Sequence, residues 1–101
     1  MSVERAVEYA RWFRCLSDPT RIRLLHLISN ADEPMTVGEL VARIGKSQST
    51  VSRHLRLLAD DEYIFTEPDG VRTMVSVNRA CMSALPTAAR EIMGVDDAAS
   101  P

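Results

Sequence analysis

The chain has 101 residues and a net charge of −2, which suits one domain and does not by itself predict a nucleic-acid partner. It has no run of about 20 apolar residues, and charge is spread throughout its start, "MSVERAVEYARWFR". The sequence therefore predicts a cytoplasmic protein without a membrane segment. Its two cysteines, Cys15 and Cys81, are too few for the disulfide framework of a small secreted fold.

A first helix is predicted over residues 3–16. At about 100° per residue, one broad arc collects Val3, Ala6, Tyr9, Ala10, Phe13 and Leu16, with Val7 and Trp12 at its margins. The opposite side holds Glu4, Glu8, Arg11 and Cys15. The arc is wider than one contact requires, and a core of this size is marginal. We therefore expect this helix to pack on its own domain and on a second chain.

A second helix is predicted over residues 17–29. Asp18 or Ser17 can cap its start, Pro19 suits a first helical turn, and Pro34 breaks the chain after it. His26, inside this helix, is expected to be partly buried.

A short helix and a longer one should follow, joined by the tight turn "GKS". Thr36 and Glu39 can form a capping box for a helix over residues 36–45, which Gly45 ends. The next helix contains "SQSTVSRHLRLL" and should end near Asp61.

A β-hairpin over roughly residues 63–77 is predicted next, because two β-prone runs are separated by Pro-Asp-Gly. Asn78 can cap a final helix through about Met93, which Pro86 should kink or split. We assign residues 1–93 to one domain and residues 94–101 to a flexible C-terminal tail.

Charge is distributed unevenly along this acidic chain. Between Leu40 and Ala59 there is no Asp or Glu, and the acids resume as "DDE" at 60–62. The acid-free window holds Arg43, Lys46, Arg53, His54 and Arg56. A basic segment of this kind indicates either a chance cluster of surface charge or a contact with an anionic partner.

Two helices joined by a tight turn and followed by a hairpin predict a mainly α fold, the winged helix-turn-helix. Val51, Leu55 and Leu58 form the inward stripe of the second of these helices, whereas Ser49, Arg53 and Arg56 point away. Small hydroxyl side chains permit close approach to a groove, and arginine can bind guanine with two hydrogen bonds. The surface therefore suits double-stranded DNA. The predicted contacts are Lys46, Gln48, Ser49, Thr50, Ser52, Arg53, His54, Arg56 and Arg72.

Two of these assignments have alternatives. His54 lies at the flank of the helix, where it either orients the helix or contacts a phosphate. Arg72, beside the hairpin tip, either contacts a phosphate or the minor groove or is an ordinary surface arginine.

Three segments resemble the ArsR/SmtB family of bacterial winged-helix repressors over about residues 5–78. They are "CLSDPTRIRLLHLI", "VGELVARIGKSQSTVSRHLRLLADDEYI" and the hairpin with "DG" at its tip. The resemblance implies a homodimer built through the first and last helices. It also implies binding to imperfect inverted repeats in promoter DNA, and many members release DNA when a metal binds.

The metal motifs of that family are missing here. Where thiol-type sensors carry "E-L-C-V-C", this chain has "ELVAR", so Val41 and Arg43 occupy the cysteine positions. The last helix, "RACMSALPTAAREIMG", has no histidine. No metal ligand is therefore assigned.

An unconventional metal or redox site is the alternative, with nickel or zinc as the metal. The available ligands are Cys15, Cys81, His26 and His54. Cys15 would share a face with Glu4 and Glu8, and a dimer could bring it to Cys81. The simpler interpretation is that the thiols are small buried hydrophobes.

The sequence thus predicts a sequence-specific DNA-binding transcriptional regulator that acts as a repressor. A winged helix used as a protein-interaction module is the second hypothesis. An enzyme is not predicted, because no nucleophile–base pair, phosphate-binding loop or metal-ligand spacing occurs.

Overall fold

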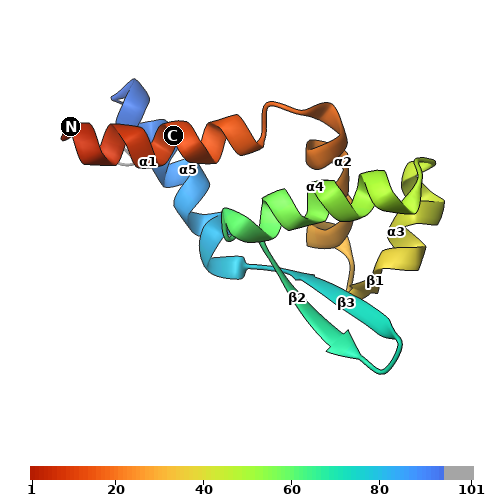
Figure 1. Cartoon of the computed structure of the whole chain (residues 1–101). Helices are drawn as coiled ribbons and strands as arrows, with labels where there is room; N and C mark the ends of the chain where they lie inside the picture. The colour runs from red at the N-terminus through yellow and green to blue at the C-terminus, as the bar shows by residue number, and fades with distance from the viewer. Residues whose placement is uncertain (95–101) are drawn as a thin grey trace.

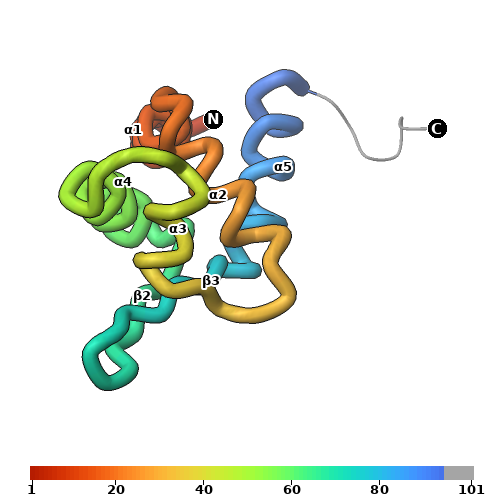
Figure 2. Tube along the Cα trace, turned by 90° about the vertical axis from the view of Figure 1, so that its right-hand side faces the viewer, coloured from red at the N-terminus to blue at the C-terminus, as the bar shows by residue number. Residues whose placement is uncertain are grey.

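The computed structural model describes residues 1–94, and the predicted tail lies, apart from Gly94, outside the described residues. The elements in chain order are α1 Val3–Cys15, α2 Pro19–Asn30, β1 Met35–Thr36, α3 Val37–Ile44, α4 Gln48–Asp60, β2 Ile64–Asp69, β3 Arg72–Val77 and α5 Arg79–Met93. The winged helix-turn-helix prediction is confirmed. In Figures 1 and 2 the β2–β3 hairpin projects from one end of the molecule, and α1 and α5 lie at the other end.

The helices begin where the sequence predicts, because side chains accept the free N–H groups of their first turns. Asp18 caps α2, and its Oδ1 accepts from the backbone nitrogens of Thr20 at 2.8 Å and Arg21 at 3.2 Å. Thr36 caps α3 through the backbone nitrogen of Glu39 at 3.0 Å. Gly45 ends α3 with a left-handed φ of 75°, which glycine adopts without strain.

The core lies between α2, α3, α4 and the sheet. Its fully buried side chains are Leu24, Leu40, Val51, Leu58, Ile64 and Val75. The predicted inward stripe of α4 is confirmed, since Val51, Leu55 and Leu58 are all buried. This packing leaves the opposite side of α4 facing outward, and it fixes the direction of that side relative to the hairpin.

The sheet corrects two expectations. It has three antiparallel strands in the order β1-β3-β2, and the two-residue strand β1, which pairs Met35 with Val75, was not predicted. Asp69 pairs with Arg72, so the turn is Gly70–Val71 and not Pro-Asp-Gly. Pro68 lies inside β2, where an edge strand tolerates a residue without an N–H.

The last helix is continuous. Pro86 lies within α5, which runs from Arg79 to Met93, so the expected split is wrong, and the alternative, a kink, stays a prediction. Asn78 caps α5 as predicted, with its side chain accepting from the backbone nitrogen of Ala80 at 3.1 Å. No helix within residues 1–94 is both long and apolar enough to cross a bilayer.

The predicted broad arc of α1 is divided between two surroundings. Tyr9 is buried, and Trp12 and Leu16 are partly buried, whereas Val3, Val7 and Phe13 remain exposed. Cys15, predicted on the polar side with the glutamates, is only 4% exposed and belongs to the core cluster. A helical wheel does not show that the N-terminal turns of α1 project past α4, as Figure 1 shows, while its last turn packs on the domain.

Three contacts hold α1 to the region around the end of α4. The Tyr63 hydroxyl donates to the carbonyl of Trp12 at 2.9 Å, and Arg11 pairs with Asp61 at 3.2 Å. The Cys15 thiol lies 3.7 Å from the carbonyl of Leu57, in donor geometry. Helix α1 is therefore attached to the helix-turn-helix unit and is not a detached arm.

Candidate nucleic-acid interface

The N-terminus of α4 is exposed and carries no acid. Ser47 caps it, and the Ser47 hydroxyl accepts from the backbone nitrogen of Thr50 at 3.2 Å and contacts the Thr50 hydroxyl at 2.9 Å. The first turn of α4 contains no acidic residue. Free N–H groups and the positive end of the helix dipole make such a terminus suitable for a phosphate.

The outward side of α4 and the preceding turn form one surface, which we call the recognition face. Its members are Lys46, Gln48, Ser49, Ser52, Arg53 and Arg56. All are exposed except Ser52, which is partly buried, as is the neighbouring Thr50. Among the ion pairs of residues 1–94, none involves Lys46, Arg53 or Arg56. These cations are therefore available to an external anion without first breaking an internal pair.

His54 does not belong to this surface. It is 7% exposed, and its Nδ1 lies 3.2 Å from Nη1 of Arg21 on α2. Burial lowers the pKa of His54. Of the two sequence interpretations, direct contact with a phosphate does not fit this burial, whereas a role in orienting the helix does. Sequence reasoning missed Arg21 because its partner is 33 residues away.

The hairpin adds polar groups beside α4. Arg72 lies 3.4 Å from Asp69 in an exposed pair at the tip. A cavity of about 330 Å³ between α4 and the hairpin is lined in part by Ser52, Arg56, Thr66 and Thr73. The two threonines were not predicted. Their register places them on the sheet face of the buried Val75, so period-two alternation was the signal that could have found them.

One chain shows no metal site among the suggested ligands within residues 1–94, and a site formed between two chains stays a prediction. Within residues 1–94 no group of three or more His, Cys, Asp or Glu side chains is placed to hold a metal ion. Burial raises the pKa of Cys15 to about 11 and also raises that of Cys81, so both thiols favour the protonated form at neutral pH. Glu4 and Glu8 are exposed, unlike the buried Cys15.

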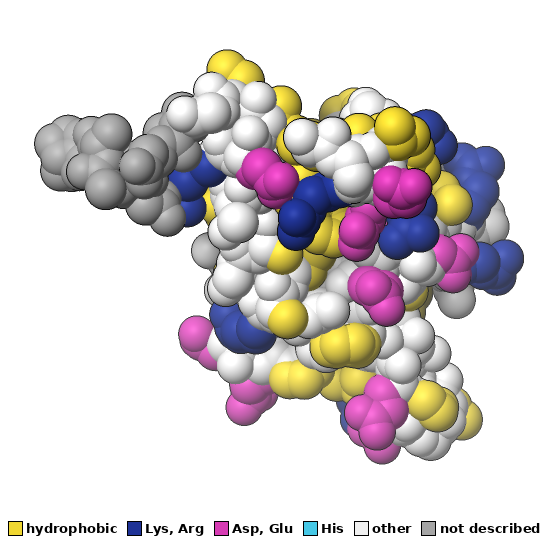
Figure 3. Space-filling view, turned by 90° about the vertical axis from the view of Figure 1, so that its left-hand side faces the viewer, with side chains coloured by type: hydrophobic (Ala, Val, Ile, Leu, Met, Phe, Trp, Pro, Cys, Tyr) yellow, Lys and Arg dark blue, Asp and Glu magenta, His cyan; other side chains and the backbone are white. Residues whose placement is uncertain are grey.

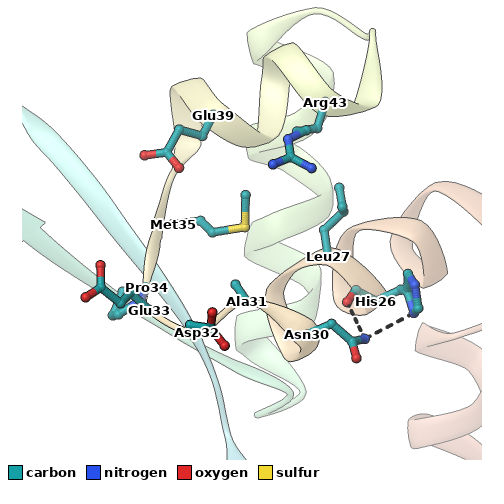
Figure 4. A pocket seen from close by; sticks show the side chains of 10 residues that line it. All are labelled: His26, Leu27, Asn30, Ala31, Asp32, Glu33, Pro34, Met35, Glu39 and Arg43. Atoms are coloured by element: carbon teal, nitrogen blue, oxygen red, sulfur yellow. Dashed lines mark hydrogen bonds between the residues drawn. The ribbon is translucent and has the colours of Figure 1, made fainter.

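His26 is exposed, not partly buried, and faces Asn30 one turn later on α2. Figure 4 shows it at the rim of a polar cavity of about 490 Å³ between α2, β1 and α3, to which Glu39 and Arg43 contribute from α3. This cavity is separate from the recognition face.

A second set of exposed side chains lies on α1 and α5, and we call this set the apolar face. Its members are Val3, Val7, Phe13, Met82, Ile92 and Met93, all exposed. Figure 3 shows hydrophobic side chains interspersed with charged ones at this end of the molecule. The two helices are joined by the Tyr9 hydroxyl, which donates to Glu91, and by Arg5, which pairs with Glu91 at 3.6 Å.

Comparison with known proteins assigns the fold to a family. Residues 18–65 match the family model described as bacterial regulatory protein, arsR family. The chain is 38% identical over 91 residues to a probable mercury resistance operon repressor of Streptomyces lividans, with 90% of this chain and 70% of that protein covered. The chain belongs to the ArsR family. The predicted resemblance is thus confirmed, and the chain is a DNA-binding transcriptional regulator of the ArsR/SmtB type.

Solved structures agree with this membership. NolR from Sinorhizobium fredii superposes with a TM-score of 0.71 at 27% identity, covering 95% of this chain and 97% of that one. The winged helix-turn-helix domain of Mb0332 from Mycobacterium bovis, described as homodimeric and DNA-binding, superposes with a TM-score of 0.69 at 20% identity. That match covers 90% of this chain and 88% of the other. These structures share the fold of this ArsR-family chain.

Proposed function

We propose that this ArsR-family protein is a homodimeric transcriptional repressor, acting in the cytoplasm, whose two copies of α4 bind the half-sites of an imperfect inverted repeat in promoter DNA. The recognition face is the observation that carries the proposal. It combines cations that form no ion pair within residues 1–94, small hydroxyl side chains and an exposed helix N-terminus in a protein whose net charge is −2. A solvated polar surface needs no such separation of charge, but a surface that contacts phosphates does.

The individual contacts follow from position along α4. Arg53 and Arg56 point outward from the helix and contact base edges or phosphates, and Ser49 and Ser52 permit close approach to the groove. Lys46 in the turn contacts the backbone, and Gln48 and Thr50 lie at the helix start beside it. Arg72 at the hairpin tip contacts the flanking groove. Thr66 and Thr73 join this set as hydroxyl donors for a phosphate beside the hairpin.

Dimerisation is supported by the apolar face. Six exposed large hydrophobic side chains on two adjacent helices are more than a small monomer needs. The structural relative from M. bovis is described as homodimeric, which supports a homodimer for this chain as well. The name of the S. lividans relative, a probable operon repressor, supports repression as opposed to activation.

The proposal is tested by fluorescence anisotropy with a duplex from the region upstream of the protein's own gene and with a scrambled duplex of equal length. We expect tighter binding to the upstream duplex, a steep decrease of affinity with salt, and two chains per site by light scattering. Equal binding to both duplexes would reject sequence-specific recognition. Absence of any salt-dependent binding would favour the protein-interaction module.

A metal or redox response is the second candidate function, and the S. lividans relative favours it because it is named for mercury resistance. The anisotropy titration is therefore repeated with mercury(II), zinc and nickel ions and with an oxidant. The double variant Cys15→Ser, Cys81→Ser tests thiol involvement. A response that survives this change would exclude cysteine ligation and direct attention to histidine and carboxylate ligands.

A further inference from the structure

The guanidinium of Arg21 joins three helices. Arg21 lies in the first turn of α2, where the Asp18 cap accepts from its backbone nitrogen at 3.2 Å. Its Nε donates to the carbonyl of Cys15, the last residue of α1, at 2.6 Å. Its Nη1 lies 3.2 Å from Nδ1 of His54 on α4. One side chain therefore links the end of α1, the start of α2 and the middle of α4.

These contacts determine the state of the His54 ring. A guanidinium has only donors, so Nδ1 of His54 must be the acceptor. The ring is then neutral and carries its proton on Nε2. Protonation would add a hydrogen to Nδ1, so that two N–H donors would face each other. The hydrogen bond would be lost, and the two positive charges would repel each other.

We propose that Arg21 and His54 are positioning residues for DNA binding, which hold α4 in a fixed orientation relative to α1. The inference rests on the proposed function, in which α1 belongs to the dimer interface and α4 contacts DNA. His54 directly follows Arg53, a member of the recognition face, and lies within one turn of Arg56. A change in the position of His54 against α2 therefore moves both of these arginines. His54 itself is buried and does not contact DNA in this proposal.

The device responds to pH in a defined direction. The charged groups around His54 are Asp18 and Arg21 on α2, Arg53 on α4 and Lys46 in the preceding turn. Burial lowers the pKa of His54, Asp18 opposes this, and the three cations reinforce it. The contribution of the neutral ring to stability is thus complete above the ordinary histidine pKa of 6.5. It is lost as pH falls through the lower pKa of the folded state.

The test compares wild type with three variants. His54→Asn retains an acceptor near the Nδ1 position but cannot be protonated. His54→Leu removes the acceptor while retaining an apolar volume. His26→Asn is the matched control, because His26 and His54 are the chain's two histidines and His26 is exposed on α2. The probe is a duplex selected from random-sequence DNA by the wild-type protein, and anisotropy is measured from about pH 7.5 to pH 5.5, where histidine titrates.

As pH falls, we expect wild type and His26→Asn to lose affinity relative to His54→Asn, by about tenfold once the His54 ring is protonated. At the upper pH, His54→Asn should bind nearly as wild type does, and His54→Leu about tenfold more weakly. Circular dichroism confirms that each variant is folded. In the free wild-type protein, the imidazole ¹⁵N spectrum should show the neutral ring of His54 with its proton on Nε2, a measurement that needs no DNA.

Two results would overturn the proposal while leaving the proposed function intact. One is equal affinity of folded His54→Leu and wild type for the selected duplex at the upper pH. The other is an imidazole spectrum with the proton on Nδ1. If the wild-type protein selects no duplex at all, the proposed function fails first, and the spectrum alone then decides whether the Arg21–His54 bond exists.

Discussion

The outward sides of α4 and α1 are both exposed, but they differ in chemistry. The recognition face on α4 carries hydroxyl groups and cations that have no ion-pair partner in the described part of the chain, and its N-terminal turn has no acid. The apolar face on α1 and α5 carries large hydrophobic side chains, and the cation Arg5 beside it is already paired with Glu91. Free cations suit a phosphate backbone, whereas apolar side chains with satisfied charges suit another protein surface. The same short chain therefore presents two surfaces for two kinds of partner.

The largest effect should come from the inward side of α4, because both surfaces depend on it. Val51→Asp places a carboxylate at a position with 0% exposure and should lower the free energy of unfolding by about 4 kcal/mol or more. Urea unfolding followed by circular dichroism measures this. Arg53→Asp, two residues away on the outward side, should unfold close to wild type. Equal urea midpoints for Val51→Asp and wild type would show that Val51 does not face the core.

Crowding the recognition face should abolish specificity without damaging the fold. Ser49→Leu or Ser52→Leu prevents close approach, and binding to the selected duplex should fall to the level of scrambled DNA, about a thousandfold or more. Anisotropy on both duplexes provides the measurement. Phe65→Leu, which keeps an apolar side chain on the hairpin, serves as the control. Wild-type affinity in both serine variants would remove α4 as the DNA-contacting element.

A charge introduced on the apolar face should weaken dimerisation first and DNA binding only as a result. Phe13→Asp is expected to weaken dimerisation by about 3 kcal/mol, because a carboxylate would be buried between the two chains, and DNA affinity should fall with it. Sedimentation equilibrium measures the dimer constant. Phe65→Asp is the control, since Phe65 is also exposed but lies on β2. A wild-type protein that is monomeric at micromolar concentration would invalidate the dimer.

Two cations on the recognition face should behave differently from one another. Arg53→Ala should cost about 1–3 kcal/mol and relax base preference at one position of each half-site. Lys46→Ala should weaken binding to all sequences equally and reduce the salt slope by about one phosphate per subunit. Isotherms at several salt concentrations separate these outcomes. Identical behaviour of the two variants would mean that Arg53 contacts only the backbone.

The smallest effect is expected at α3, outside both surfaces. Val41 and Arg43 occupy the positions where thiol-sensing relatives of the family carry cysteine, and each is changed to Ala. Neither should change the ratio of DNA affinities measured with and without zinc or nickel. A change in that ratio would place a metal-responsive element at α3, next to the polar cavity in Figure 4.

Local patterns predicted the parts of this molecule that depend on local forces. Helix starts follow from the side chain that caps them, so Asp18 and Thr36 placed α2 and α3 correctly. The buried stripe of α4 follows from a period that is repeated along the helix. The outward side of the same helix then follows by subtraction, which is why most of the recognition face could be named from sequence.

The remaining features depend on contacts between distant segments. Strand β1 has two residues and exists because β3 pairs with it, so no local pattern marks it. Cys15 is buried because the last turn of α1 packs on the domain, while Glu4 and Glu8 on the same side of the helix face solvent. The bond between Arg21 and His54 spans 33 residues, and neither residue type announces it.

Asn78 connects the helix-turn-helix unit to α5, and this connection affects how two chains can be arranged on DNA. Its side chain caps α5 and donates to the carbonyl of Glu62 at 2.8 Å, and its backbone nitrogen donates to the carbonyl of Tyr63 at 2.9 Å. The junction between α4 and the hairpin and the start of α5 are therefore fastened to one residue. Recognition helices related by a two-fold axis must lie about 34 Å apart to enter successive major grooves. If α5 helps to form that axis, the bonds of Asn78 fix the angle between α5 and α4. This angle limits the half-site spacings that the two copies of α4 can span.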